Sequence, residues 1–186
     1  MRESRRVAVL ISGRGSNMRA LVEGADGYDV VLVASNKPEA PGLNWARDRM
    51  IPTWTWDSRG KERSLWEAAL DQSLTDHRVG TIALAGFMRI LSPQFISRWS
   101  GRILNIHPSL LPKYRGLDTH GRAIEAGDPV SGCSVHVVTE ELDAGDVIAQ
   151  AEVEIRPGDT PETLEARVLE AEHRLYPKAL ADFVSR

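Results

Sequence analysis

A polar pair stands near the end of an apolar run in the second half of the chain. Asn105 and His107 are two residues apart, so in an extended strand their side chains point to the same face. Pro108 favours extended backbone at His107, which keeps the pair aligned. An amide and an imidazole that converge on one point can donate hydrogen bonds to a developing oxyanion. A structural Asn-x-His-Pro turn is the alternative interpretation of the same spacing.

Two carboxylates are further candidates for chemistry. Asp143 lies in the turn Leu142-Asp143-Ala144-Gly145, where a solvated turn residue is the ordinary interpretation. Beside His107, however, its charge would favour the imidazolium and serve proton transfer. Glu172 flanks the apolar stripe of the last predicted helix, where burial of a carboxylate is costly. It either reaches water or receives hydrogen bonds from a substrate.

A glycine-containing loop near the N-terminus is typical of an anion site. The segment Gly13-Arg14-Gly15-Ser16-Asn17 separates an apolar run from a short helical pattern, with Ser16 or Asn17 as the expected helix cap. Glycines let the backbone approach a phosphate, and the first N–H groups of a helix favour its charge. The loop lacks the third glycine of a dinucleotide fingerprint and the Gly-Lys-Ser/Thr of a P-loop, which disfavours nicotinamide and ATP. An ordinary tight turn is the alternative.

The first half of the chain predicts the elements that position this loop. Unbroken apolar runs at 7–11, 30–34 and 81–85 indicate buried parallel strands. A shorter strand is expected at 53–56, with Trp54 and Trp56 on one face. Helical patterns at 43–50 and 63–74 fall between these strands. The alternation of strand and helix predicts an α/β fold with a doubly wound, mostly parallel sheet.

The second half predicts antiparallel additions to that sheet. Strands are expected at 102–107, 134–139 and 147–155, with a short helix at 122–125. The last two strands are joined by a turn, so they must pair antiparallel. A helix is expected to begin at Asp159-Thr160-Pro161 and to end or kink at Pro177. Residues 1–186 are expected to form one domain.

Composition excludes several classes of protein. The 186 residues carry a net charge of −3, which argues against a dominant nucleic-acid footprint. The single cysteine, Cys133, allows no intramolecular disulfide and is expected to be a core thiol. No apolar run near the N-terminus is long enough for a signal peptide or membrane span, so a cytoplasmic protein is expected. The other histidines show no metal-binding spacing, and His136 is expected to be a packed residue.

Five segments together resemble one enzyme family, the folate-dependent glycinamide ribonucleotide formyltransferases of purine synthesis. They occur in order along almost the whole chain, which makes the set far more specific than any one member. The segments are Ile11-Ser12-Gly13-Arg14-Gly15-Ser16-Asn17, Ala85-Gly86-Phe87-Met88-Arg89-Ile90-Leu91-Ser92-Pro93, Leu104-Asn105-Ile106-His107-Pro108-Ser109-Leu110-Leu111-Pro112, Gly132-Cys133-Ser134-Val135-His136 and Leu142-Asp143-Ala144-Gly145.

The resemblance implies a Rossmann-like formyltransferase fold and a role for each candidate residue. It places phosphate and ribonucleotide binding in the N-terminal half, and catalysis and folate binding in the C-terminal half. The implied catalytic residues are Asn105, His107 and Asp143. The implied ribonucleotide-binding residues are Gly15, Ser16, Asn17, Arg63 and Glu172, and the implied folate-binding residues are Met88, Arg89, Ile90, Leu91 and Leu142.

The implied reaction is transfer of the formyl group of 10-formyltetrahydrofolate to the amine of the ribonucleotide. It involves small-molecule substrates and needs no metal, ATP, nucleic acid or membrane; a homodimer is compatible with the sequence. A chain of this length is expected to lack the extra domains of related hydrolases and transfer-RNA formyltransferases. A formyltetrahydrofolate hydrolase and a non-catalytic folate- or nucleotide-binding module are the alternatives. Cys133, Ala144 and Asp146 depart from the threonine, glycine and proline usual in the family.

Overall fold

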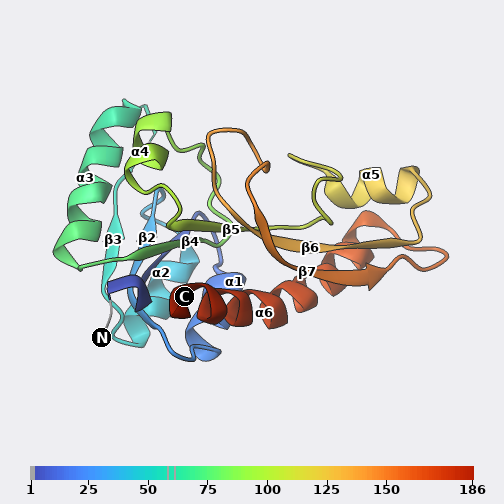
Figure 1. Ribbon diagram of the computed structural model, residues 1–186, viewed down its shortest axis with the longest axis horizontal. Coiled ribbons are helices and arrows are strands. Elements are labelled where there is room, and N and C mark those ends of the chain that lie inside the picture. The colour runs from blue at the N-terminus through green and yellow to red at the C-terminus, as the bar shows by residue number, and fades with distance from the viewer. Residues whose placement is uncertain (1–2, 58, 61) are drawn as a thin grey trace.

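A seven-stranded mixed sheet with the order β3-β2-β1-β4-β5-β6-β7 forms the centre of the computed structural model, which describes residues 3–57, 59–60 and 62–186. The first five strands in sequence pair in parallel, and β6 and β7 are antiparallel additions at one edge. The strands are β1 (Arg6–Ile11), β2 (Asp29–Ser35), β3 (Thr53–Thr55), β4 (Thr81–Leu84), β5 (Ile103–His107), β6 (Val130–Val137) and β7 (Val147–Glu154). The predicted doubly wound sheet with antiparallel C-terminal strands is thus confirmed (Figure 1).

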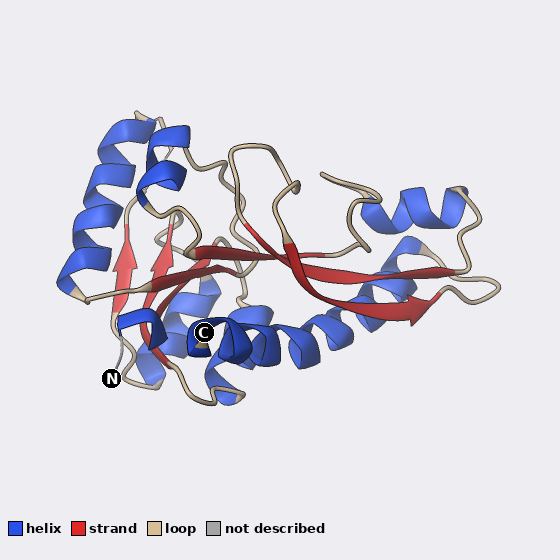
Figure 2. Cartoon of the chain, in the orientation of Figure 1, coloured by secondary structure: helices blue, strands red, loops and turns tan. Residues whose placement is uncertain are grey.

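Helices cover both faces of the sheet because the central strands are apolar on both faces. Val7 and Val9 of β1 pack with α1 (Ser16–Glu23), α2 (Pro41–Asp48) and α6 (Pro161–Ser185). Ala8 and Leu10 face the other way and pack with α3 (Arg63–Asp76) and α4 (Pro93–Arg98). Figure 2 shows the two groups of helices on opposite sides of the strands. The chain also contains a 3₁₀ turn at Glu3–Arg5 and α5 at Thr119–Glu125.

Several element boundaries differ from the predictions. Strand β6 begins at Val130 rather than 134, and α5 begins at Thr119 rather than 122. Helix α4 was not predicted, although its start carries a clear signal: the Ser92 hydroxyl accepts a hydrogen bond from the Phe95 N–H at 3.1 Å, and Pro93 follows at the first helical position. Strand β3 ends at Thr55, one residue before the predicted end, and Trp54 stacks on Trp56 just beyond it, with the ring centroids 6.5 Å apart.

Helix α6 continues through Pro177 to Ser185, so of the two outcomes expected at this proline, an end or a kink, the end is wrong. A proline inside a helix removes one backbone hydrogen bond, and tertiary packing outweighs that loss here. Pro177 is buried against Gly24, where a β-carbon would approach the proline ring to 3.0 Å. The neighbouring Tyr176 hydroxyl donates to the carbonyl oxygens of Leu84 and Leu104, at 3.1 and 3.2 Å. The start of the helix is as predicted, with Thr160 as N-cap and Pro161 next.

The two faces of β5 have different neighbours. Leu104 and Ile106 belong to the core on the α6 side, so Asn105 and His107 face the opposite side. Figure 1 shows loops, rather than a helix, over the adjoining ends of β5 and β6 on that side. The polar pair therefore faces the side of β5 that carries these loops. No helix among the described residues has the length and apolarity that crossing a membrane requires.

Candidate active site

The pairing of β5 with β6 brings a second histidine to the polar pair. The antiparallel register sets Asn105 opposite His136 and His107 opposite Ser134. Directly opposed side chains on one face of a sheet are in contact. Asn105 Nδ2 lies 3.2 Å from His136 Nε2, within hydrogen-bond distance. The sheet itself therefore assembles an amide and two imidazoles at the carboxyl end of β5.

Asp143 completes the cluster from the turn before β7. Its backbone has a φ of 49°, in the left-handed region, and its side chain is 8% exposed. One carboxylate oxygen, Oδ2, accepts from the Gly116 N–H at 3.0 Å and lies 3.4 Å from His107 Nδ1. The other, Oδ1, lies 3.5 Å from His136 Nε2. The structure thus brings the three predicted catalytic residues, Asn105, His107 and Asp143, together around one carboxylate.

The surroundings of Asp143 favour its charged form. Burial alone would raise the pKa of this carboxyl group. The contact with the His136 ring, the Gly116 N–H and the charges of the two histidines outweigh burial and hold the pKa below its ordinary value. Asp143 is therefore a carboxylate at neutral pH, able to orient a histidine and to stabilise its charged form.

The His107 ring is held from both sides. Its Nε2 is 2.9 Å from the carbonyl oxygen of Tyr114, and its Nδ1 faces Asp143. Both neighbours are acceptors, so the imidazolium, with N–H groups on both nitrogens, satisfies both. The Ser109 hydroxyl donates to the Lys113 carbonyl at 2.6 Å and so fixes the loop that carries Tyr114. The ring is oriented before any substrate binds.

The turn that carries Asp143 tolerates two departures from the family pattern. Gly145 cannot carry a side chain, because a β-carbon there would lie 1.8 Å from the Val137 carbonyl oxygen. Ala144 replaces the neighbouring glycine and is half-buried, and the Asp146 side chain is exposed. The close approach between this turn and β6 thus depends on Gly145, which the sequence retains. The third departure, Cys133, is a buried core thiol as expected, and burial raises its pKa to about 12.

The N-terminal loop forms a second group with Glu172. The N-cap of α1 is Gly15, whose φ is 73° and which has no side chain to cap the helix. The prediction that Ser16 or Asn17 caps the helix is therefore wrong. The first N–H groups of α1 have no intrahelical acceptor, which suits an anion. Asn17 turns inward instead, and its Nδ2 donates to Glu172 Oε2 at 2.7 Å. Two of the predicted ribonucleotide-binding residues, Asn17 and Glu172, are therefore joined across α1 and α6.

The pair of Asn17 and Glu172 is buried and incompletely satisfied. Burial raises the pKa of the Glu172 carboxyl group, although the hydrogen bond from Asn17 opposes that effect. Asn17 is 8% exposed, and its Oδ1 is buried with no hydrogen-bond partner in the described part of the chain. An unpaired buried acceptor costs free energy that a ligand donor would recover. Both side chains are thus suited to receive polar hydrogens of a ligand.

The other predicted binding residues fall into two classes. Arg63 is the first residue of α3 and is exposed, and its side chain makes no hydrogen bond or ion pair with another described residue. Met88, Ile90 and Leu142 are apolar and 70%, 69% and 58% exposed, which suits the wall of an apolar ligand site. Leu91 differs, because its side chain is buried in the core. Arg89 is half-buried, with its guanidinium 5.5 Å from the centre of the Trp66 ring.

The two groups both lie at the carboxyl ends of the parallel strands. Strands β1 and β5 flank β4, so their carboxyl ends are about 10 Å apart at the usual strand spacing. Ser12 joins the loops between them: its hydroxyl donates to Asn36 Oδ1 at 2.6 Å and accepts from the Met88 N–H at 2.8 Å. The strand order reverses between β1 and β4, the place where open α/β sheets bind ligands.

Sequence reasoning missed three residues that hold this site: His136, Gly116 and Tyr114. His136 was expected to be only a packed residue; it is 2% exposed, but it also contacts Asn105 and Asp143. Its position opposite Asn105 depends on the register between β5 and β6, which no short pattern in the sequence gives. Gly116 and Tyr114 act through backbone atoms, for which the sequence carries no signal.

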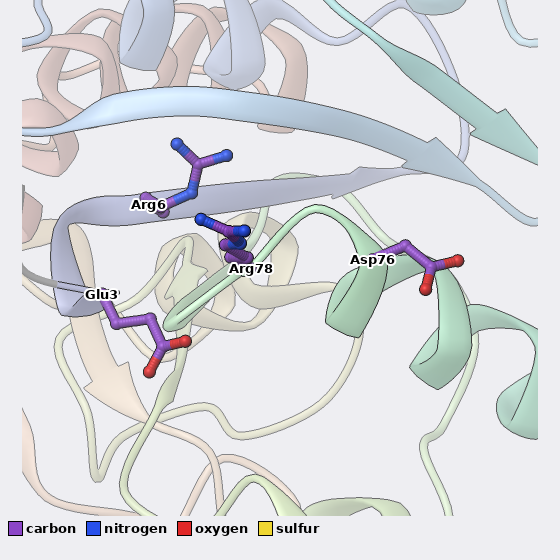
Figure 3. A pocket seen from close by; sticks show the side chains of 4 residues that line it. All are labelled: Glu3, Arg6, Asp76 and Arg78. Atoms are coloured by element: carbon purple, nitrogen blue, oxygen red, sulfur yellow. The ribbon is translucent and has the colours of Figure 1, made fainter.

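A separate cavity lies at the other end of the central strands, near the amino ends of β1 and β4. It has a volume of about 630 Å³ and is lined by Glu3, Arg6, Asp76 and Arg78 (Figure 3). The Arg6 guanidinium donates from Nε and Nη2 to the His77 carbonyl oxygen, at 3.1 and 2.9 Å. None of the predicted site residues lines this cavity. Within residues 3–57, 59–60 and 62–186, no three His, Cys, Asp or Glu side chains are grouped to hold a metal ion.

Known proteins resemble the chain over nearly its whole length. Trifunctional purine biosynthetic protein adenosine-3 of Gallus gallus is 48% identical over 94% of this chain, which spans only 18% of that protein. Phosphoribosylglycinamide formyltransferase of Escherichia coli is 45% identical, with 95% of this chain and 86% of that one covered. The crystal structure of phosphoribosylglycinamide formyltransferase from Brucella melitensis has a TM-score of 0.93 at 48% identity, covering 98% and 96% of the two chains.

The family assignment agrees with these likenesses and with the fold. Residues 5–180 match the formyl transferase family, a range that includes every predicted site residue. The matched range contains all seven strands and most of α6. The chain therefore belongs to the formyl transferase family.

Proposed function

We propose that this protein transfers the formyl group of 10-formyltetrahydrofolate to the amine of 5'-phosphoribosylglycinamide, a step of purine biosynthesis. The observation that carries the proposal is the convergence of Asn105, His107 and Asp143 beside a separate loop suited to phosphate. The names of the relatives in Escherichia coli and Brucella melitensis support the same acceptor. Residues 1–186 act as one domain in this proposal, with the ribonucleotide bound by the N-terminal half.

The proposed reaction is direct transfer through a tetrahedral intermediate. The ribonucleotide amine attacks the formyl carbon and forms a new C–N bond. Asn105 then donates a hydrogen bond to the oxygen that becomes negative, and the charge of the His107 ring, held by Tyr114 and Asp143, stabilises it electrostatically. The bond to the folate nitrogen breaks as a proton moves from the amine to that nitrogen. Asp143 assists this transfer as a base, directly or through one water, and keeps His107 oriented.

The binding residues divide between the two substrates. The N–H groups at Gly15, Ser16 and Asn17 receive the phosphate together with Arg63, and Glu172 accepts hydrogen bonds from the ribonucleotide. Met88, Ile90 and Leu142 pack against the folate, while Arg89 and Leu91 contribute backbone groups. Two substrates held at the carboxyl ends of the parallel strands need no covalent enzyme intermediate, and their proximity supplies much of the acceleration.

One assay tests the proposed function against its alternatives. The protein is mixed with 10-formyltetrahydrofolate, with and without the ribonucleotide, and formation of tetrahydrofolate is followed. We expect turnover only when the ribonucleotide is present. Turnover without it would indicate a hydrolase, and no turnover at all would indicate a binding module. Unchanged turnover after treatment with a chelator and without ATP is expected, because the proposed steps use neither.

The proposal also includes a cytoplasmic location and permits a homodimer. A folate and a ribonucleotide are both small, charged or polar molecules. Because the protein has a net charge of −3, it attracts such anions through local basic groups and not through its overall charge. Fractionation of cells and light scattering of the purified protein test the two points separately.

A further inference from the structure

His136 occupies a position between two of the proposed catalytic groups. It is 2% exposed on β6, and its Nε2 lies 3.2 Å from Asn105 Nδ2 and 3.5 Å from Asp143 Oδ1. The other ring nitrogen, Nδ1, lies 3.1 Å from the Val137 carbonyl oxygen. Because that carbonyl can only accept, Nδ1 carries a proton. Only Nε2 is left to interact with the site.

The contact with Nε2 determines how the Asn105 amide is rotated. An amide has a donor end and an acceptor end, and only one of them can face a ring nitrogen at a time. When Nε2 has no proton, it accepts from the amide nitrogen. When Nε2 carries a proton, it attracts the amide oxygen, and both amide N–H groups become free for a substrate oxygen. A proton on Nε2 also satisfies Asp143 Oδ1.

The pairing of β6 with β7 is irregular at His136. The register between β6 and β7 shifts between Val135 and His136, which pair with Ala149 and Val147. Ile148 of β7 is therefore left unpaired opposite this part of β6, as in a β-bulge. The Val137 N–H donates to the Asp146 carbonyl oxygen at 2.9 Å, which ties the same stretch of β6 to the turn that carries Asp143.

We propose that His136 is a positioning residue for formyl transfer, whose Nε2 accepts one N–H of the Asn105 amide and so fixes its rotation, leaving the second N–H for the formyl oxygen. Asp143 acts on Asn105 through this ring, as it acts on His107 directly. The inference rests on the proposed function for its catalytic meaning. The contact between His136 and Asn105 is open to a test that does not depend on activity.

Three substitutions separate the two ring nitrogens. His136→Gln places an amide at the distance of Nε2, His136→Asn reaches only as far as Nδ1, and His136→Leu removes both. We expect kcat to fall about tenfold or more in the Asn and Leu variants, less than the hundred- to thousandfold cost of losing an oxyanion donor itself. The Gln variant should stay within about threefold of the unchanged protein. KM for both substrates should change less than about twofold, because neither substrate is expected to contact His136.

A matched control removes packing on the same strand. Val135 is fully buried on the opposite face of β6, so Val135→Ala leaves a cavity away from the site. It should lower the melting temperature while changing kcat less than about twofold. A loss of kcat in Val135→Ala as large as in His136→Leu would overturn the inference, because any damage to β6 would then explain the effect. Equal activity of the Gln and Asn variants would also overturn it.

Coupling to Asn105 is the sharpest test. In an Asn105→Ala background, His136→Leu should lower kcat further by less than about twofold, because there is no amide left to orient. Independent, multiplicative losses would overturn the inference. In the ligand-free protein, ¹⁵N–¹H spectra should show the Asn105 side-chain amide exchanging with solvent about threefold faster, or more, in His136→Asn than in His136→Gln. Equal exchange would overturn the inference even if the unchanged protein proved inactive in the formyl-transfer assay.

Discussion

The two buried carboxylates of the site have opposite surroundings. Asp143 lies among two histidines and a backbone N–H, and its pKa is lowered. Glu172, on α6, receives a hydrogen bond only from Asn17 among the described residues, and its pKa is raised by burial. The negative charge of Asp143 is thus already stabilised by groups of the protein itself. Glu172 lacks further donors, which a ligand with hydroxyl or N–H groups can supply, so one carboxylate suits catalysis and the other suits recognition.

The largest effect is expected from Asp143→Asn, which keeps the shape and removes the charge. Turnover should fall at least about a hundredfold, the upper part of what proton transfer supplies, because the amide neither accepts a proton nor favours the imidazolium of His107. Steady-state kinetics measure the loss, and circular dichroism checks that the fold is intact. Near-normal kcat in a folded variant would remove Asp143 from the mechanism and with it the contrast between the two carboxylates.

Glu172→Gln should affect recognition instead of turnover. The Gln carbonyl can still accept from Asn17, but it offers the ribonucleotide a weaker acceptor than a carboxylate. KM for the ribonucleotide should rise roughly tenfold, the value of a charge-assisted hydrogen bond, with KM for the folate unchanged. Kinetics with each substrate varied in turn provide the measurement. If kcat falls a hundredfold with KM constant, Glu172 belongs with the catalytic group.

Arg63→Ala should have a smaller effect in the same direction. Arg63 is exposed and has no described partner, so its contribution to phosphate binding is screened by solvent. Affinity for the ribonucleotide should fall about fivefold, and affinity for the folate should not change. Titration calorimetry with each ligand separates the two. An equal loss for both would mean that Arg63 does not contact the phosphate; Arg78→Ala, at the other end of the central strands, is the control.

The smallest effect concerns stability, and it has opposite signs for the two carboxylates. A lowered folded-state pKa means that Asp143 contributes stability above its unfolded pKa of about 3.9, lost as pH falls through the folded value. A raised pKa means that Glu172 contributes stability below its unfolded pKa of about 4.3, lost as pH rises through the folded value. At pH 7, Glu172→Gln should therefore raise the melting temperature by about 2 °C, and Asp143→Asn should lower it. Calorimetry at pH 7 and pH 4 tests this, and shifts of the same sign at pH 7 would contradict it.

Local patterns predicted most of the fold, and tertiary packing accounts for the errors. The apolar runs of β1, β2 and β4 and the capped start of α6 are strong short-range signals, and the structure has them where expected. The prediction at Pro177 rests on the low preference of proline for the interior of a helix. Packing against Gly24 and the hydrogen bonds of the neighbouring Tyr176 outweigh that preference. No sequence pattern of α6 alone contains that information.

The site was predictable where residue types carry the chemistry and not where geometry does. Asn105, His107 and Asp143 were found from their types and order, and the structure brings them together. The roles proposed for them await the experiments above. His136 was misjudged because its meaning comes from a register that spans β5 and β6. The contact between Asn17 and Glu172 joins residues 155 positions apart, which no local pattern reports.

That long-range contact has a consequence for how the protein folds while it is synthesised on the ribosome. The glycine-containing loop and Asn17 are synthesised early, whereas Glu172 lies in α6, the last element of the sheet's helical cover. Domains begin to organise as the chain emerges, with the N-terminal part first. The early strands can pair, but the ribonucleotide site remains open on one side until 161–185 have been made and have docked. A nascent chain halted before that helix would therefore expose an apolar face of its sheet and bind no ribonucleotide.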